Sequence, residues 1–438
     1  MEPLPSFVAL VQPLCGVMTA PTYRIFITLL TGWLLARRRT ITGALVAAGV
    51  PGQRHHAAFH RFFSAAQWSI DALGFAVFEL IVSALQMRDT IWLTLDDTHS
   101  RKYGRDIFGA GMHHDPIIST RSRHVVTWGL TWVVLCVGVR LPCCPERFFS
   151  LPVLFRLYLN KKGAARWRRA YRSKPELAVS LLRLLCGHCP DRRFHALVDS
   201  SYGGQSVLAH LPPNCDMTSR LDLDARLHEA PPPRRAGKAG RPRVRGGRLP
   251  TPRQMLAQRG RRRTLDLYGR RDRVRLVAVT ARCFRVPNRS LRIVVVEPLG
   301  GGRPVQAFFS TVACAADVQV LRWYSRRWSI EETFAASKSW LGMNQPQVWC
   351  RRSVERAAPV GMLLYSLVVV WFGAVGYTHW QAVPMSWYPA RSAPSFGDML
   401  ATLRRQILAH NLVSRTPAND GQTQKTLATL IDLVVRAA

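Results

Sequence analysis

Two short apolar runs with strand character each lead directly into an aspartate. Residues 90–95 read Thr-Ile-Trp-Leu-Thr-Leu and precede Asp96, and residues 194–198 read Phe-His-Ala-Leu-Val and precede Asp199. Strand-like and helix-like patterns alternate around them, which is typical of an α/β layer. In such sheets, carboxylates at strand ends point into the crevice where ligands bind. We therefore expect Asp96 and Asp199 to face a ligand-binding crevice.

The rest of the chain divides by its hydrophobic periodicity. Residues 1–85 show mostly helical spacing, and residues 164–185 predict a basic amphipathic helix. Further strands are predicted at residues 125–139 and, interrupted at Pro287-Asn288, at residues 274–296. We expect a helical N-terminal DNA-binding domain, a catalytic core in two parts, a basic loop with a β-rich insertion between those parts, and a helical C-terminal region. The N-terminal domain is expected at residues 1–85 and the two parts of the catalytic core at residues 86–227 and 307–378. The basic loop with its insertion is expected at residues 228–306, and the C-terminal region at residues 379–438.

The charge of the chain indicates a polyanionic partner. Its 438 residues include 61 Lys and Arg against 26 Asp and Glu, which leaves a net charge of +35. Enzymes of small metabolites rarely carry such an excess, whereas nucleic-acid-binding proteins do. Because 48% of the residues are hydrophobic, the chain can bury a sizeable core and is not disordered throughout.

Much of this charge lies in one segment. No acidic residue stands between Glu229 and Asp266, where glycine and proline are frequent, and this composition predicts a loop that follows a phosphate backbone. Within it, Gly240-Arg241-Pro242-Arg243 resembles the core of an AT-hook, although a plain electrostatic tether is favoured. The segment holds Arg234, Arg235, Lys238, Arg241, Arg243, Arg245, Arg248, Arg253, Arg259, Arg261, Arg262 and Arg263.

A second basic stretch mixes positive and aromatic side chains. In residues 54–68, the basic side chains could bind phosphates while the aromatic ones stack on bases. Alternatively, these residues could form a solvated helix face over a core. The sequence leaves these two alternatives open. Residues 101–104, Arg-Lys-Tyr-Gly, are also expected to meet the DNA backbone.

Several patterns indicate a reduced, cytoplasmic protein outside the membrane. The first 23 residues contain Glu2 and no Lys or Arg, unlike a signal peptide. Residues 359–377 are apolar and long enough to span a bilayer, but a buried core helix is the favoured interpretation. The cysteines form no disulfide framework, and Cys186-Gly-His-Cys189, despite its zinc-like spacing, is expected to pack in the core.

A third carboxylate lies in a predicted helix. Residues 315–341 have helical spacing, so Arg327 and Glu331, four residues apart, should share a face, with Tyr324 and Lys338 nearby. Asp96, Asp199 and Glu331 are hard oxygen ligands of the kind that bind Mg²⁺ or Mn²⁺. Two such ions can activate an attacking oxygen and stabilise a leaving one.

These motifs carry a family resemblance. Tyr324-x2-Arg327-x3-Glu331-x6-Lys338 matches the Y-R-E-K signature of DDE transposases encoded by bacterial insertion sequences. The run Leu95-Asp96-Asp97-Thr98 resembles the first-aspartate motif of that family, and the run from Val198 to Gly203 resembles the second. The separations between the three carboxylates fit as well.

The resemblance implies an RNase H-like catalytic core in which Asp96, Asp199 and Glu331 bind two Mg²⁺, with Mn²⁺ able to substitute. It implies that Tyr324, Arg327 and Lys338 contact phosphates near the cleaved end. The expected function is a bacterial transposase, associated with the nucleoid, that cleaves DNA at the ends of its insertion sequence and joins the 3′-hydroxyls to target DNA. A homodimer is expected when two ends are paired.

Some alternatives stay open. Asp97 could replace Asp96 as the first ligand, because neighbouring strand residues point to opposite faces and only one can face the metals. Glu332 fits the spacing less well than Glu331. His113-His114-Asp115 could bind a metal, but a structural or phosphate-facing loop is favoured. The alternative function is a regulatory or architectural DNA-binding protein, derived from a transposase, that no longer cuts.

Overall fold

The structure is a computed structural model of the chain. It describes residues 1–52, 54–115, 118–120, 122–233, 241, 243–267, 270–382, 393–412 and 421–437. The chain forms two compact units, and each is discontinuous in sequence. The first unit consists of Met1–Arg88, Asp97–Tyr171 and Glu331–Ala438, and the second of Asp89–Asp96 and Arg172–Ile330. The unit boundary falls within strand β1 (Ile91–Arg101) and within helix α11 (Ser329–Ser339).

The first unit is built from helices around a long β-hairpin. Besides parts of β1 and α11, it contains α1 (Pro5–Val11), η1 (Gln12–Val17), α2 (Ala20–Leu35), α3 (Ile41–Ala47), α4 (Ala57–Ser64), α5 (Ile70–Ala84), β2 (Gly111–His114), β3 (Val126–Leu141), β4 (Cys144–Tyr158), α6 (Lys161–Arg166), α12 (Arg351–Ala374), η3 (Gly376–His379), α13 (Phe396–Leu412) and α14 (Gly421–Ala437). The expectation of a helical N-terminal region is confirmed.

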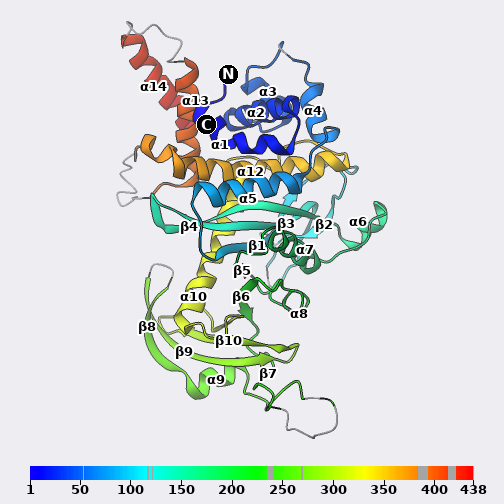
Figure 1. Cartoon of the computed structure of the whole chain (residues 1–438), viewed down its shortest axis with the longest axis vertical. Coiled ribbons are helices and arrows are strands. Elements are labelled where there is room, and N and C mark those ends of the chain that lie inside the picture. The colour runs from blue at the N-terminus through cyan, green and yellow to red at the C-terminus, as the bar shows by residue number, and fades with distance from the viewer. Residues whose placement is uncertain are drawn as a thin grey trace. The chain divides into compact units, whose positions relative to one another are not determined.

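The hairpin of β3 and β4 carries the core of this unit. Helices α5 and α12 pack on β4 and on each other (Figure 1). The approach of α5 is so close that a Cβ atom at Gly74 would lie 2.1 Å from the carbonyl oxygen of Val153, so this position requires glycine. The Ser366 hydroxyl of α12 donates to the Pro152 carbonyl at 2.8 Å, which fixes the helix on the strand.

Helix α12 contains the apolar stretch that is long enough to span a membrane. In its most apolar window, 83% of the residues are buried inside the protein. Its neighbours in the first unit are β4, α4, α5 and α13. This environment is that of a core helix, as expected from the sequence.

The second unit is organised around a mixed sheet. It contains α7 (Lys174–His188), β5 (Phe194–Val198), α8 (Gln205–Leu208), β6 (Cys215–Leu221), β7 (Leu227–His228), α9 (Pro252–Arg259), β8 (Arg261–Leu267), β9 (Arg270–Cys283), β10 (Val286–Pro298), β11 (Gln306–Ser310), α10 (Asp317–Ser325) and η2 (Arg326–Trp328).

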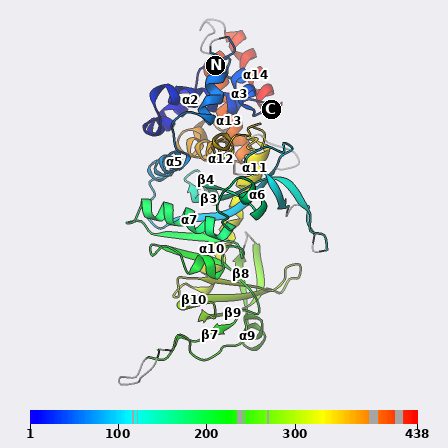
Figure 2. The ribbon, with the colours of Figure 1, turned by 90° about the vertical axis from the view of Figure 1, so that its right-hand side faces the viewer.

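In this sheet the strand order is β1-β5-β6-β11-β10-β9-β7, and β8 also pairs with β9. Strands β1, β5 and β6 are parallel, and the others are antiparallel to their neighbours. Helix α10 packs on β6, β10 and β11. Helix α9 packs on β9 and β10 (Figure 2). The expected fold class is thus confirmed: an RNase H-like α/β protein with a mixed sheet, flanking helices, a β-rich insertion and a helical N-terminal region.

Two expectations about helices and loops are wrong. Residues 164–185 form not one helix but parts of two, because Arg168 has a positive φ and Ser173 opens a new helix through a capping box with Glu176. The basic segment is partly ordered as α9 and β8. Thr251 and Gln254 make another capping box there, and Met255 and Leu256 are buried.

Candidate catalytic site

The carboxyl ends of β1 and β5 bring the two aspartates to neighbouring positions. In their parallel pairing, the last pair of the register is Leu95 opposite Val198. Asp96 and Asp199 come next on the two strands, which lie about 4.8 Å apart as neighbours in a sheet do. Both aspartates are half-buried. The second unit therefore presents two carboxylates at one edge of its sheet.

Asp96 forms an ion pair with Arg327 of η2. The arginine Nη1 donates to Asp96 Oδ2 at 3.0 Å, and the two side chains are only 12% and 17% exposed. A charge-assisted bond in such a shielded place is stronger than a surface pair. Arg327 thus connects η2 to the end of β1. The four-residue spacing of Arg327 and Glu331 in the sequence does not predict this contact.

The helix expected at residues 315–341 is interrupted at Arg327. The chain forms α10, then the 3₁₀ turn η2, then α11. Two serine hydroxyls bond backwards to carbonyl groups here, Ser325 to Arg322 at 2.8 Å and Ser329 to Arg326 at 2.9 Å. Such bonds compete with regular α-helix geometry and bend helices.

Tyr324 is largely a core residue. It is 8% exposed and belongs to the apolar cluster of the second unit, with its ring centroid 4.6 Å from that of Phe308. Burial raises the pKa of its hydroxyl, while the charge of Arg327 and a hydrogen bond from it act in the opposite direction. Asp199 is close enough to contribute to the rise. Tyr324 therefore contributes mainly to the core of the second unit.

The turn after β5 holds Asp199 in place. Its Oδ1 accepts the backbone N–H groups of Ser201 at 2.9 Å and Tyr202 at 3.3 Å. The Ser219 hydroxyl of β6 donates to the Asp199 carbonyl at 2.8 Å, and a Cβ atom at Gly203 would lie 2.3 Å from that hydroxyl oxygen. Glycine is therefore required in this turn, and the carboxylate orientation is set by the backbone.

The two glutamates of α11 differ in their surroundings. Glu332 accepts a hydrogen bond from Arg147 Nη2 at 3.0 Å, which attaches it to β4. The next residue, Thr333, donates to the Ser150 carbonyl of β4 at 2.8 Å. Glu331 is half-buried and opens the part of α11 that belongs to the first unit. Glu332 therefore has a structural role on β4, and Glu331 remains the candidate ligand.

Lys338, the last member of the four-residue signature, also lies in the first unit. Burial lowers the pKa of its ammonium group, and the nearby charge of Asp115 opposes that effect. Asp115 itself is 3% exposed. The two cations of the signature, Arg327 and Lys338, each have an aspartate of their own unit as a neighbour.

A comparison with known protein families decides the broad identity of the chain. A family model described as DDE superfamily endonuclease matches residues 13–282, more than half of the sequence. The chain belongs to the DDE superfamily endonucleases. No curated protein matches it. The matched region includes Asp96 and Asp199 and ends before Tyr324, so it does not test the Y-R-E-K signature.

The residues of this DDE endonuclease fit a divalent metal ion. Endonucleases of this superfamily act on DNA and generally use divalent metals. Asp96 and Asp199 supply hard carboxylate oxygens at one sheet edge, the donor type that Mg²⁺ and Mn²⁺ prefer. The guanidinium group of Arg327 already places one positive charge on Asp96 Oδ2. A metal ion bound by Asp96 would share this carboxylate with Arg327.

Asp97 faces different neighbours from Asp96. Burial raises the pKa of Tyr158 on β4 to about 12, with smaller contributions from Tyr171 and from the charge of Asp97. Asp97 therefore lies near Tyr158, in the first unit, whereas Asp96 lies beside Arg327 in the second. The opposite orientation of neighbouring strand residues explains the difference.

The His113-His114-Asp115 sequence does not converge on one point. His113 is buried and His114 exposed, as expected for successive residues of β2. The ring of His113 lies 5.6 Å from that of Tyr158, and the ring of His114 lies 5.4 Å from that of His124. The structural interpretation of this sequence is supported.

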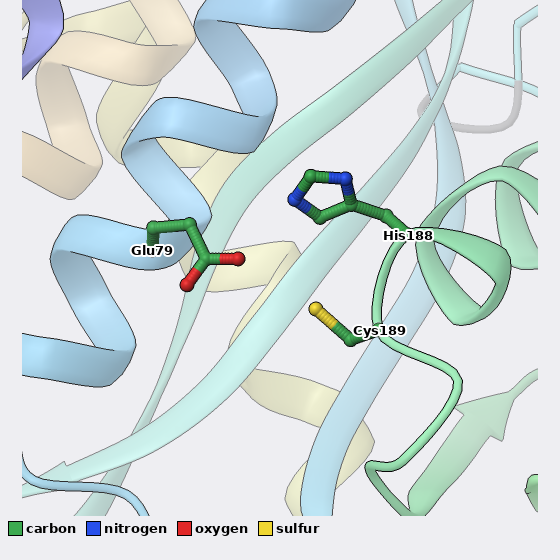
Figure 3. Close-up of side chains that lie close together, drawn as sticks. All are labelled: Glu79, His188 and Cys189. Atoms are coloured by element: carbon green, nitrogen blue, oxygen red, sulfur yellow. The ribbon is translucent and has the colours of Figure 1, made fainter.

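Four of the cysteines are buried, namely Cys136, Cys144, Cys186 and Cys215, whereas Cys189 is intermediate and Cys314 and Cys350 are exposed. All ten are free thiols. Cys186 is buried and hydrogen-bonded to Cys215 of β6, and this bond together with burial raises the pKa of the Cys215 thiol well above its usual range. His188 is the last residue of α7, and Cys189 follows it. Figure 3 shows both side chains, together with that of Glu79 of α5. Cys186 thus pairs with a core thiol of β6.

The aromatic residues of 54–68 belong to the core. Phe59, Phe62, Phe63 and Trp68 are at most 7% exposed, and the basic residues of α4 face solvent. This stretch is therefore a solvated helix face over a core, and base stacking by these rings is excluded.

The side chain of Lys102 is bound within the protein. Its Nζ donates to the carbonyls of Asn344 at 2.7 Å and Pro346 at 3.1 Å. Burial lowers its pKa to about 8.

The basic segment contributes exposed arginines. Arg241 and Arg243 are exposed, whereas Gly240, Pro242 and residues 234–239 of this segment lie outside the described residues. Arg263 of β8 pairs with Asp317 at 3.1 Å. The AT-hook interpretation therefore stays a prediction, and the exposed arginines are available to a polyanion.

Sequence reasoning missed an arginine-lined cavity in the second unit. It has a volume of about 500 Å³ and adjoins the turn after Asp199, with Ser200, Gly203 and Arg220 in its wall. Phe284, in the turn between β9 and β10, lies under the guanidinium group of Arg245 at 3.7 Å from the ring centroid. Arg220 is found only through the pairing of β6 beside β5, because no local motif marks it.

Proposed function

We propose that this DDE endonuclease is a transposase that cleaves DNA at the ends of its insertion sequence and joins the freed 3′-hydroxyls to target DNA. The observation that carries the proposal is the parallel pairing of β1 and β5, which places Asp96 and Asp199 together with Arg327 bonded to Asp96. The resemblance of Tyr324, Arg327, Glu331 and Lys338 to the Y-R-E-K signature supports the transposase branch.

In this proposal Asp96, Asp199 and Glu331 hold two Mg²⁺, which Mn²⁺ can replace. Ions bound by these residues would activate the attacking oxygen and stabilise the leaving oxygen of the phosphodiester. Arg327 and Lys338 bind phosphates of the cleaved end, and the Tyr324 hydroxyl orients Arg327. The shielding of Arg327 strengthens each of its hydrogen bonds.

The protein's partners follow from the same proposal. The transposon ends and the target are both double-stranded DNA. The net charge of +35 favours binding to such a polyanion. Two ends are paired by a homodimer in the bacterial cytoplasm, at the nucleoid. Arg241 and Arg243 follow the phosphate backbone outside the catalytic site.

A plasmid assay tests the proposal. Purified protein is incubated with Mg²⁺, a supercoiled plasmid carrying the coding region with its natural flanking DNA, and a second target plasmid. We expect nicks at two fixed positions and products in which the excised segment is joined to the target. Cleavage without any joined product would support an endonuclease activity and contradict the proposal that the protein is a transposase.

The variant Asp199→Asn tests the site itself. It removes a ligand charge at nearly constant volume, so cleavage should be lost while binding to the flanking DNA remains. Asp191→Asn is the matched control, because Asp191 is an exposed aspartate shortly before β5. Cleavage by Asp199→Asn at the rate of Asp191→Asn would exclude Asp199 from the site.

A further inference from the structure

One face of the sheet in the second unit carries a row of arginines. On the other face, Val274 and Leu276 of β9 are buried in the apolar cluster that α10 completes. Side chains alternate along a strand, so Arg271, Arg273 and Arg275 point away from that cluster. Arg271 and Arg273 are exposed, as this alternation requires. We call the face that carries these arginines the outer face.

The third arginine of the row has its charge compensated within the protein. Arg275 lies beside the end of α9, where a Cβ atom at Gly260 would be 2.8 Å from the Arg275 Cγ. Its Nε forms an ion pair at 2.8 Å with Glu297, the residue opposite it on β10. Arg271 and Arg273 lie nearer the start of β9, before this ion pair.

The outer face opens there into a hollow of about 800 Å³. It is separate from the cavity that adjoins the turn after Asp199. Its lining residues come from β8, β9, the end of β10 and the turn between β10 and β11. Strand β8 pairs with β9 so that Arg262 stands opposite Arg275. The arginine hollow is defined by four exposed side chains: Arg262, Arg271, Arg273 and Arg303.

A glycine turn, Gly300–Gly302, forms one wall of the arginine hollow. The Leu299 N–H donates to the Arg273 carbonyl at 2.8 Å, which fixes the start of the turn on β9. Gly301 and Gly302 have φ values of +78° and +83°, in the left-handed region that favours glycine, and a Cβ atom at either would meet open space. The turn therefore presents bare backbone to the hollow.

The arginine hollow keeps an excess of positive charge when its acidic residues are counted. Asp272 pairs with Arg303 at 3.8 Å, and the two side chains are 31% and 43% exposed, so water screens this pair. Asp266 stands opposite Arg271 in the register of β8 and β9. Four guanidinium groups against two carboxylates leave two positive charges in excess.

We propose that the arginine hollow binds the backbone of duplex DNA through two successive phosphates of one strand. Arginine can hold a phosphate through two donors of its planar group, and a turn of glycines lets the backbone approach an anion closely. Arg271 and Arg273 are two residues apart on one strand face, about 7 Å, so each can bind a phosphate of its own. That this phosphodiester backbone belongs to DNA rests on the proposed function. The contact lies outside the carboxylate site, and neither the signature nor the AT-hook pattern contains it.

DNA binding in EDTA tests the arginine hollow without cleavage. A fluorescent duplex with the sequence that flanks the coding region is titrated with protein over a range of salt concentrations. With Arg271→Gln and Arg273→Gln combined, affinity at low salt should fall about tenfold or more, because charge-assisted contacts are lost. The slope of log affinity against log salt should decrease by about 0.9 for each of the two phosphates.

The matched control is Arg275→Gln. It makes the same change on the same face of β9, at a position where Glu297 already compensates the charge. Affinity and salt slope should both match those of the wild type. Thermal melting shows whether each variant is folded.

Neutral phosphates locate the contact on the DNA. In a set of duplexes, each carries one methylphosphonate in place of a phosphate, which removes a single charge. Two successive positions should weaken binding by the wild type. The same two positions should have no effect on the double variant, since its contact is already lost. The comparison is a double-mutant cycle between protein and DNA.

Two results would overturn the proposal: a salt slope of the double variant equal to that of Arg275→Gln, or a methylphosphonate profile equal to that of the wild type. Titration with inorganic phosphate separates a second source of the same chemistry. If the double variant loses affinity for inorganic phosphate and keeps its affinity for DNA, the hollow is a site for the free ion and the proposal is wrong. A wild-type protein that shows the expected binding but never nicks the plasmid would instead reject the proposed function, and the role of the hollow would stand.

Discussion

Arg327 and Lys338 belong to one sequence signature, yet the structure gives them different partners. Arg327 bonds to Asp96, which stands at the end of β1 beside Asp199 in the second unit. Lys338 has as its neighbour Asp115, which Arg101 and Thr127 already hold in the first unit. The first carboxylate is a proposed metal ligand, so Arg327 must share it. The second already accepts hydrogen bonds from two protein side chains, and its charge opposes the effect of burial on the pKa of Lys338.

The substitution that should change cleavage most distinguishes the two neighbouring aspartates of β1. Asp96→Asn should reduce cleavage by about 10³-fold or more, because it removes a metal-ligating charge, whereas Asp97→Asn should retain most activity. Single-turnover cleavage of the flanking DNA measures both. If the Asp97→Asn variant is inactive and the Asp96→Asn variant is active, Asp97 is the metal ligand. The ion pair between Arg327 and Asp96 would then have only a structural role.

The next effect sharpens the difference between the two signature cations. Arg327→Ala should lower cleavage by about 10–100-fold, and Arg327→Lys should recover only part of it, because a planar guanidinium can bind phosphate and carboxylate through two donors. Binding to unrelated duplex DNA should hardly change. The measurement is cleavage of a pre-nicked terminal substrate, with folding checked by thermal melting.

An Arg327→Ala protein that folds, binds ends and cuts them at the normal rate would contradict this expectation. Lys338→Ala is the parallel variant, and cleavage by it should lose the part of the pH dependence that comes from the lysine, which Arg327→Ala keeps. Wild-type lysine can lose its proton, whereas arginine cannot. Equal pH profiles for the two variants would remove the contrast between the two sites.

The smallest effect concerns charge outside the catalytic site. Changing Arg241 and Arg243 to glutamine should lower the slope of log affinity against log salt by up to about 0.9 for each lost phosphate contact. Arg263→Gln is the matched control, because its partner Asp317 already engages it. A loss restricted to A·T-rich duplexes would favour the AT-hook interpretation, and an unchanged slope would show that these arginines do not touch DNA.

Local patterns predicted strands better than they predicted helix ends. The run at residues 194–198 matches β5 residue for residue, and the run at residues 90–95 marks the start of β1. The helix expected at residues 315–341 is divided at the 3₁₀ turn η2, next to which Ser325 and Ser329 bond to backbone carbonyls. These bonds depend on side-chain rotamers, which apolar spacing does not reveal.

The basic segment shows why composition alone can mislead. Its arginines, glycines and prolines predicted a loop, yet Thr251 and Gln254 cap a short helix, and Met255 and Leu256 bury its inner face. A capping box is a local signal and was present in the sequence. The excess of charge around it concealed that signal.

Local sequence patterns predicted the residues of the proposed site: two aspartates after strands, a glutamate, and a signature spacing from Tyr324 to Lys338. Those features are local, so a linear pattern can carry them. The pairing of Arg327 with Asp96, 231 residues earlier, arises only in the folded chain. Such pairs arise when strands and helices from distant segments pack together and exclude water, which strengthens each charge interaction and makes every buried carboxylate require a partner.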